Sequence, residues 1–246
     1  MFGNIEFMAM FVCKKLFFLL LLLSVFIVGC TTEPVIKKNR LAVGSILVLP
    51  VTSAHDELLV DAELILERLE SQLKSYDFAV FRIPDTQVKA FQEQALELSG
   101  SVYSPKIKKS VPLDKLKYKH HLIKLIASQY DFDAVALPEL WLRSIRVKED
   151  EASWDGVSRD IEFINKPEKN YKLPKSARGI SLRLTLLSRK GALIDASFGG
   201  MSLPYKVNYE DGKAGFDLKE TFYSQRDIKE AVKIVLTQLN VDIRAK

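Results

Sequence analysis

Residues 180–198 read ISLRLTLLSRKGALIDASF, and this stretch shows the clearest structural pattern in the chain. Every second residue from 180 to 186 is isoleucine or leucine, and serine, arginine and threonine lie between them. Such alternation is typical of a half-buried β-strand. Arg189-Lys190-Gly191 then predicts a tight turn, after which residues 192–198 return. We therefore expect an antiparallel β-hairpin here.

Upstream and downstream of the hairpin, strand and helix patterns alternate. Compact apolar runs predict strands at 45–51, 78–83 and 133–147. Apolar positions at helical spacing predict helices at 57–76, 85–100, 115–130 and 224–239, the last beginning with a capping box. The charged segment 149–175 predicts a loop or irregular hairpin with a strand at 161–164. This order predicts one α/β domain over residues 43–246, with a mixed β-sheet, the antiparallel hairpin and helices packed on its faces.

Composition agrees with a globular chain. The chain has 246 residues, of which 48% are hydrophobic and 27% are charged, and this balance excludes a disordered protein. Its two cysteines exclude a disulfide scaffold and a four-cysteine zinc site. The net charge of +5 is mild for this length and does not call for nucleic acid as a partner.

The first 29 residues predict a signal peptide. Lys14 and Lys15 precede a thirteen-residue apolar run at 16–28, interrupted only by Ser24. A membrane-spanning helix needs about 20 residues, whereas the apolar core of a signal peptide has this shorter length. A start at Met8 or Met10 would give a more typical charged segment before the run.

The run ends in Ile27-Val28-Gly29-Cys30, which resembles the bacterial lipobox. The resemblance implies that the Cys30 thiol receives a diacylglycerol, that cleavage makes Cys30 the first mature residue, and that its amine is acylated. Residues 30–42 are then a lipidated tether, and the acyl chains anchor the protein at about 0.8 kcal/mol per buried CH₂. Thr31, rather than an aspartate, follows the cysteine and implies the outer membrane. The alternative is a simple N-terminal membrane anchor that ends in a chance cysteine.

Three further passages resemble a loose superfamily of envelope domains. ILVLPV at 46–51 precedes a helix rich in leucine and glutamate, YDFDAVAL at 130–137 is similar to its YGAD-x-V-L-x-G passage, and LTLLSRKGALI at 184–194 is similar to its hairpin turn. The superfamily includes the N-terminal domain of the Tol-system propeller protein, the curli-secretion lipoprotein and lipoprotein activators of penicillin-binding proteins. The resemblance covers roughly residues 43–236. It implies a binding or assembly module in the envelope, and no catalytic residues to transfer to this chain.

Catalytic and metal-binding motifs are scarce in this sequence. Ser71 and Lys74 have the S-x-x-K spacing of serine acylases, but the companion motifs are absent and a solvated helix face is the simpler interpretation. His120 and His121 are adjacent on a predicted helix, so they diverge by about 100° and cannot bind one metal together, and His55 is alone. The acidic stretch 149–160 lacks calcium-loop spacing and predicts a solvated loop. We therefore expect no cofactor, no metal and no enzyme activity.

A lysine-rich segment is the one charge cluster that suggests a partner. Six lysines face a single acid between residues 105 and 121, and they would contact an anionic surface: Lys106, Lys108, Lys109, Lys115, Lys117 and Lys119. The simpler alternative is a solvated loop and helix start. Few aromatic residues accompany these lysines, so nucleic acid is not an expected partner.

These observations predict an outer-membrane lipoprotein that is anchored through lipid on Cys30, faces the periplasm, and acts as a non-enzymatic binding or adaptor module for an envelope protein. Two alternatives remain: a subunit of an oligomeric outer-membrane export assembly, which would need lipid-facing hairpins that the charged insert 148–178 does not resemble, and an envelope hydrolase with an unrecognised site. The sequence leaves open whether the chain forms a homo-oligomer, and whether Trp141 and Trp154 line a groove or only pack.

Overall fold

The computed structural model describes residues 42–99, 115–166, 171, 173, 175–210, 213–239 and 242–243. The predicted signal peptide, Cys30 and nearly all of the predicted tether lie outside the described residues, so the domain boundaries there remain predictions. These described residues belong to one compact unit. Within the described part of the chain, no helix combines the length and the apolar character that crossing a membrane requires.

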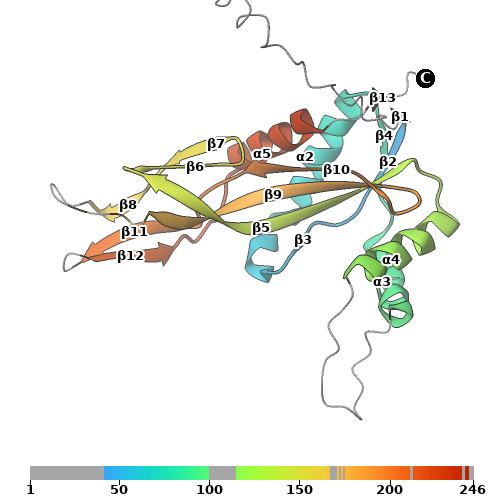
Figure 1. Ribbon diagram of the computed structural model, residues 1–246, viewed down its shortest axis with the longest axis horizontal. Coiled ribbons are helices and arrows are strands. Elements are labelled where there is room, and N and C mark those ends of the chain that lie inside the picture. The colour runs from blue at the N-terminus through green and yellow to red at the C-terminus, as the bar shows by residue number, and fades with distance from the viewer. Residues whose placement is uncertain are drawn as a thin grey trace, which may run out of the picture. The chain divides into compact units, whose positions relative to one another are not determined.

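A mixed eight-stranded β-sheet lies at the centre of the domain (Figure 1). Five of its strands follow one another in the order β10-β9-β5-β2-β4: β10 (Leu193–Gly200), β9 (Ser176–Ser188), β5 (Ala134–Lys148), β2 (Ser45–Val48) and β4 (Ala79–Phe81). β2 pairs in parallel with β4 and β5, whereas β5, β9 and β10 pair antiparallel. Three shorter strands join this path: β3 (Thr52–Ser53), β6 (Glu151–Trp154) and β7 (Val157–Asp160). The predicted α/β fold with a mixed sheet is confirmed.

The predicted hairpin is β9 and β10, which pair from Leu187 opposite Leu193 to Ser181 opposite Gly200. Its turn is closed by the amide of Gly191, which donates to the Ser188 carbonyl over 2.7 Å. Gly191 has a φ of 78°, a conformation that L side chains rarely adopt, and this explains the glycine in the turn.

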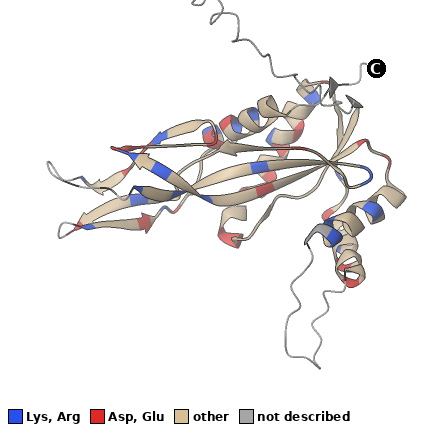
Figure 2. Ribbon diagram, viewed as in Figure 1, with Lys and Arg blue, Asp and Glu red and all other residues tan. Residues whose placement is uncertain are grey.

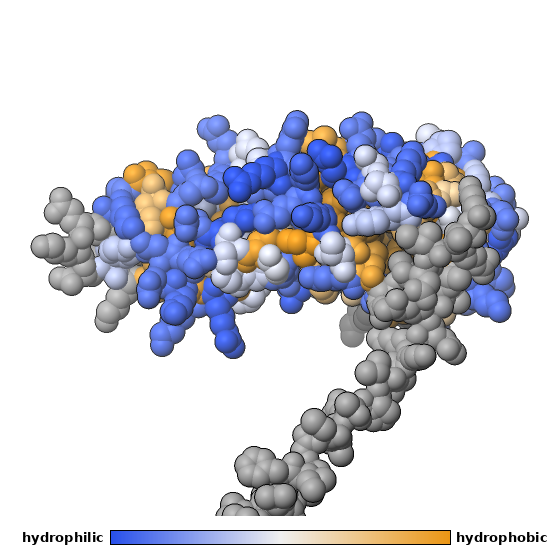
Figure 3. All heavy atoms as spheres, turned by 90° about the horizontal axis from the view of Figure 1, so that it is seen from above, coloured by the Kyte–Doolittle hydropathy of each residue, from blue (hydrophilic) through white to orange (hydrophobic). Residues whose placement is uncertain are grey.

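Helices cover both faces of the sheet, and they separate its core into two parts. α2 (Ala62–Ser75) and α5 (Gln225–Gln238) pack on one face, against Ile180, Leu182, Leu184 and Leu186 of β9. α3 (Asp85–Leu98) and α4 (Lys115–Gln129) pack on the other, against Val135 and Leu187. Because each helix buries only one side, the face seen in Figure 3 is mostly hydrophilic, with hydrophobic colour confined to narrow patches.

The start of α5 follows the predicted capping box. The Ser224 hydroxyl accepts a hydrogen bond from the Asp227 amide over 3.3 Å, and the Asp227 carboxylate accepts one from the Ser224 amide over 2.8 Å. Two of the unpaired donors of the first helical turn are satisfied in this way, which fixes where the helix begins.

Residues 45–51 do not form the single strand that the apolar run predicts. β2 ends at Val48, and β3 resumes only at Thr52. Proline has no amide hydrogen for the ladder, so Pro50 interrupts the pairing with β5. Leu49, Pro50 and Thr52 at this interruption line a cavity beside β5.

A second, three-stranded sheet is absent from the sequence-based prediction. It has the order β12-β11-β8, from β12 (Lys213–Leu218), β11 (Tyr205–Glu210) and β8 (Phe163–Asn165). A third apolar cluster supports it, in which Ile145, Ile161, Leu203 and Val207 are buried. A two-residue pair, β1 (Ala42–Val43) with β13 (Asp242–Ile243), and the 3-10 helix η1 (Asp56–Leu59) complete the described elements.

Tyr223 gives a pH-dependent prediction for this fold. Its hydroxyl donates to the Leu58 carbonyl over 2.6 Å, and burial raises the pKa of Tyr223 from its ordinary value of 10 to about 12. Because the pKa of Tyr223 is higher in the folded than in the unfolded state, the protonated hydroxyl contributes fully to the free energy of unfolding below pH 10. This contribution is lost as the pH rises toward 12.

We expect Tyr223→Phe to lose about 1 kcal/mol of unfolding free energy at pH 8. The variant should also show a shallower decline than the wild type from pH 10 to 12, in denaturant titrations across that range. An equally steep decline in the variant would contradict this assignment.

Candidate functional site

The break between β2 and β3 opens the sheet beside β5. β2 pairs with β5 as far as Val48 opposite Ala136, and β3 pairs with it again from Thr52 opposite Glu139. The chain between them leaves the ladder after the Leu49 amide donates to the Ala136 carbonyl over 3.0 Å. Ligands of α/β proteins commonly bind at this place, just beyond the carboxyl ends of parallel strands.

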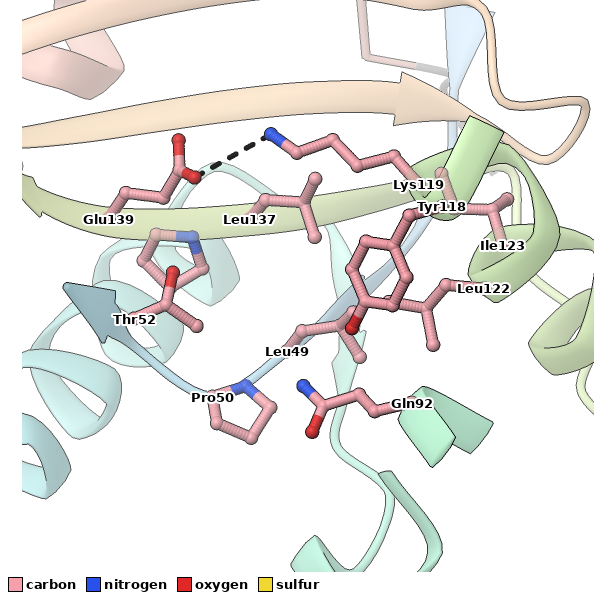
Figure 4. Close-up of a pocket in the computed structure, with 11 residues that line it drawn as sticks. Leu49, Pro50, Thr52, Gln92, Tyr118, Lys119, Leu122, Ile123, Leu137 and Glu139 are labelled. Carbon is pink, nitrogen blue, oxygen red and sulfur yellow. Dashed lines mark ion pairs between the residues drawn. The ribbon is translucent and has the colours of Figure 1, made fainter. Parts of the chain in front are cut away.

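A cavity of about 240 Å³ lies at this break, between β5, α3 and α4 (Figure 4). Most of its lining is apolar, and the lining residues are Leu49, Pro50, Thr52, Gln92, Tyr118, Lys119, Leu122, Ile123, Leu137, Pro138 and Glu139. Sites for drug-sized ligands typically exceed about 300 Å³, so this cavity suits a single apolar side chain better than a cofactor. Burial raises the pKa of Tyr118 above its ordinary value.

Charges at the rim of the cavity converge on one carboxylate. Lys119 reaches across from α4 to Glu139 at 3.5 Å (Figure 4), and Arg183 of β9 lies 3.4 Å from the other oxygen of the same carboxylate. The side chain of Glu139 is 19% exposed. Two cations therefore share one anion, and the rim carries one positive charge in excess.

Hydrogen bonding at this rim is incomplete. Glu139 Oε2, Arg183 Nε and Thr185 Oγ1 are buried and have no hydrogen-bond partner among the described residues. Glu139 lies opposite Arg183 in the β5–β9 ladder, and Thr185 is the next residue but one on β9, so the three atoms belong to one patch. Buried polar atoms are nearly always paired in proteins, so this patch points to a water or a binding partner.

The same face of the sheet continues as a strip of aromatic and arginine side chains. Trp141 meets Phe198 edge to face with 6.2 Å between ring centroids, and Trp141 is 43% exposed. Arg143 lies over the Phe198 ring at 4.3 Å, and Arg183 lies over Trp141 at 5.1 Å. Trp141 therefore belongs to an open surface that also carries cations.

Trp154 has the opposite role. Its Nε1 donates to the Ser181 hydroxyl over 3.1 Å, and its ring lies so close to Gly179 that an added Cβ would sit 2.8 Å from it. Trp154 packs and closes one end of the strip. The question that the sequence left open thus has a different answer for each tryptophan.

The lysine-rich segment lies only partly within the described residues. Lys106, Lys108 and Lys109 lie outside them, and Lys115 is described only as the first residue of α4. Lys117 is exposed, whereas Lys119 is half-buried and pairs with Glu139. Lys119 thus belongs to the cavity rim, and contact of the segment with an anionic surface stays a prediction.

At 149–160 the interpretation as a solvated loop is wrong, and the alternative prediction of an irregular hairpin is confirmed. These residues form the hairpin of β6 and β7, and the carboxylates at its ends have specific partners. Asp155 lies 3.1 Å from Arg143 and accepts from the Ser181 hydroxyl over 2.7 Å. Asp150 pairs with Lys166. The hydrogen bond from Lys166, and to a smaller extent the one from Tyr171, holds the pKa of Asp150 below its usual range. Long-range pairing decides the structure here, and local composition does not reveal it.

The other candidate residues have structural surroundings. Ser71 is exposed on α2, and Lys74 lies 3.6 Å from Glu70 one turn away. His55 lies 3.5 Å from Glu57, and the rings of His120 and His121 have their centroids 6.1 Å apart. Over the described ranges, no three His, Cys, Asp or Glu side chains gather where they could hold a metal ion.

Asp133 has a clear structural role in the turn before β5. Its carboxylate accepts hydrogen bonds from the Gly44 and Ser45 amides over 2.8 and 2.9 Å. These bonds fix the start of β2 beside the start of β5, and the exposed Asp131 pairs instead with Arg189 of the hairpin turn. The two aspartates therefore do not act as a carboxylate pair.

Glu139 allows a direct test of the rim geometry. We expect Glu139→Gln to lower the unfolding free energy by about 1–2 kcal/mol, because Lys119 and Arg183 lose their shared anion. Glu93→Gln, at an exposed position of α3, is the matched control and should change it by less than about 0.5 kcal/mol. Urea denaturation of both variants measures the difference, and equal effects would show that the rim pair is not formed.

No protein-family model matches the chain, and no curated protein matches it. Among solved structures, the chain is similar to the lipoprotein GNA1162 from Neisseria meningitidis, at 15% identity and a TM-score of 0.30, over 64% of this chain and 81% of that one. That neighbour is a bacterial lipoprotein, as the lipobox would suggest for this chain. A likeness this weak carries no argument on fold or function, and the named superfamily remains a resemblance in sequence.

Proposed function

We propose that this protein is an outer-membrane lipoprotein, anchored through lipid on Cys30, whose α/β domain faces the periplasm and serves as a non-enzymatic binding or adaptor module. The observation that carries the binding role is the open strip of Trp141, Phe198, Arg143 and Arg183 beside the apolar cavity. Tryptophan and arginine are the residues most enriched among those that dominate protein–protein binding energy. The lipobox supports the anchor.

The polar groups near the cavity support binding better than catalysis. The Ser53 hydroxyl donates to the Leu140 carbonyl and accepts from the His55 amide, while the His55 ring lies beside Glu57. This serine is therefore not aligned with the neighbouring imidazole as a nucleophile would be with its base. Glu139 is engaged by two cations, which hold it as a structural anion at the rim.

Cross-linking of the full lipidated chain in cells tests the proposal. The tagged chain would be cross-linked, purified under denaturing conditions and analysed by mass spectrometry, with Arg183→Glu as a variant of the strip and Lys229→Glu on exposed α5 as the control. We expect one reproducible envelope protein, lost with the first variant and kept with the second. A ladder of self-linked chains with no second protein would favour the oligomeric export assembly. Hydrolysis of an envelope polymer by the purified chain would favour the hydrolase.

A further inference from the structure

The edge of β5 that faces β2, β3 and β6 is incompletely paired. β3 pairs with this edge at Glu139 and Leu140, and β6 pairs with it from Arg146 onward. No described strand pairs with it at residues 141–145, although the opposite edge pairs with β9 without interruption. We call residues 141–145 on this edge the β5 gap. It is about 16 Å long at about 3.3 Å per residue.

Backbone groups point into the gap. In an antiparallel pair, the N–H and C=O of one residue point to the same edge of the strand, and those of the next residue point to the opposite edge. Residues two apart therefore present their backbone groups to the same edge. Leu140 uses its carbonyl on the β3 side, where it accepts from the Ser53 hydroxyl over 3.1 Å, and Arg146 pairs with β6 on that side. The N–H and C=O groups of Leu142 and Ser144 therefore point the same way, toward the open edge.

The gap is accessible. A cavity of about 400 Å³ lies at its β3 end, lined by residues 52–55 and by Glu139, Leu140, Trp141 and Leu142. Ser144, near the middle of the gap, is exposed. An open edge next to a cavity invites an added strand, because main-chain hydrogen bonds supply affinity while neighbouring pockets select side chains.

A second unpaired edge exists on the same chain. β12 is the outer strand of the three-stranded sheet, and five of its six residues are exposed. Two of them are large and apolar: Phe216 is 44% exposed and Leu218 is 76% exposed. Natural edge strands are usually protected from pairing with other chains, and an exposed one with apolar side chains is a site for strand addition.

The charges of the two edges are complementary. The β3 end of the gap is acidic, because Glu57 lies 3.5 Å from His55 in the cavity wall and Asp56 is exposed next to it. The other end carries the exposed Arg146, whereas the neighbouring Arg143 pairs with Asp155. Figure 2 shows red on η1 and blue along the distal part of β5. β12 begins with Lys213 and carries Asp217 near its end. Its six residues are one more than the five of the gap.

We infer that β12 of a second copy of this chain fills the β5 gap. The strand would run in the same direction as β5, which places Lys213 toward Glu57 and Asp217 toward Arg146. β3 and β6 close the gap at both ends and limit the added strand to about the length of β12. This self-association does not rest on the proposed adaptor role, because it uses backbone groups at the edge of β5 whereas the strip uses side chains on the face of the sheet, although Trp141 and Arg143 belong to both.

A photo-reactive phenylalanine analogue at Phe216 tests this contact in the full lipidated chain. It would be irradiated in membranes together with a differently tagged acceptor copy. We expect adducts between copies that map to residues 141–145 of the acceptor. Adducts that map elsewhere, that join only other proteins, or that fail to form between copies would overturn the inference.

Variants of the acceptor copy make the test specific. Ser144→Pro removes an N–H that points into the gap but breaks no bond to β9, and we expect it to lower the adduct yield at least tenfold. Ser144→Ala keeps that N–H and should leave the yield within about twofold. An unchanged yield with the proline would contradict the strand addition.

A charge exchange keeps the inference testable even if the proline variant does not fold. Arg146→Glu in the acceptor should lower the adduct yield several-fold, because it would place two carboxylates together with Asp217 of the other copy. Asp217→Lys in the donor copy should then restore the yield. Failure of this rescue, with both variants folded, would exclude the proposed register and direction.

Discussion

A Cys30→Ala chain is expected to incorporate essentially no fatty-acid label in cells, at least tenfold less than the wild type. Lipidation requires the thiol, and cleavage of the signal peptide follows lipidation in proteins with a lipobox. The variant should therefore also persist as a precursor that retains residues 1–29. Metabolic labelling with a palmitate analogue, followed by electrophoresis and mass spectrometry of the N-terminus, measures both effects.

Cys13→Ala is the matched control for this variant. Cys13 is the other cysteine of the chain and lies inside the predicted signal peptide, so its loss should change neither labelling nor cleavage. The alternative of a simple membrane anchor predicts a different result. In that case Cys30→Ala would behave as the wild type, with no label in either chain and no change in size.

A Gly199→Ala chain is expected to show the largest loss of stability among single methyl additions to the sheet. An added Cβ would lie 2.4 Å from the Ala231 carbonyl oxygen and 3.0 Å from two further backbone atoms of the same residue in α5. Backbone cannot rotate aside as a side chain can, so α5 and β10 would have to separate. We expect a loss of about 3 kcal/mol, at the upper end for overpacking.

Gly215→Ala is the control, because an added Cβ there meets only the Asn208 carbonyl oxygen at an ordinary 3.5 Å. It should change the unfolding free energy by less than about 0.5 kcal/mol. Thermal and urea unfolding of the two variants would compare them directly. Equal stabilities would show that α5 does not pack on β10 as closely as the structure indicates.

Local signals in the sequence were sufficient for the elements of the main sheet. The alternation at 180–186 and the glycine of the turn identify β9 and β10. The prediction of a half-buried strand is wrong, because Ser181 and Thr185 on the polar face of β9 are buried as well. Ser224 and Asp227 identify the start of α5, because capping acts within one helical turn. The apolar faces of α2, α3 and α4 follow from spacing alone.

The second sheet and the candidate site could not be predicted in this way. The strand predicted at 161–164 overlaps β8, but its partner β11 lies about 40 residues further along the chain, and no local pattern indicates that the two pair. Glu139 and Arg183 become neighbours only through the register of β5 with β9. Pro50 was the one local signal that could have predicted the break beside the cavity, since proline interrupts a β-ladder.

The exposed tryptophan shows the same limit. Trp141 and Trp154 both lie in strands with mixed neighbours, and the sequence cannot distinguish them. The folding of the β6–β7 hairpin onto β9 packs the Trp154 ring against Ser181 and leaves the Trp141 ring open. Surfaces formed by contacts of this kind depend on tertiary packing, which periodicity does not encode.

The most direct test of the central claim uses a photo-reactive phenylalanine analogue at Phe198 in the membrane-anchored chain, with the same analogue at the exposed Lys229 of α5 as control. Phe198 lies in the aromatic and arginine strip that we propose as the binding surface. A membrane-anchored binding module predicts adducts with one envelope protein from position 198 and none with that protein from position 229. Adducts of equal yield and identity from both positions, or none with any other protein from position 198, would contradict the account.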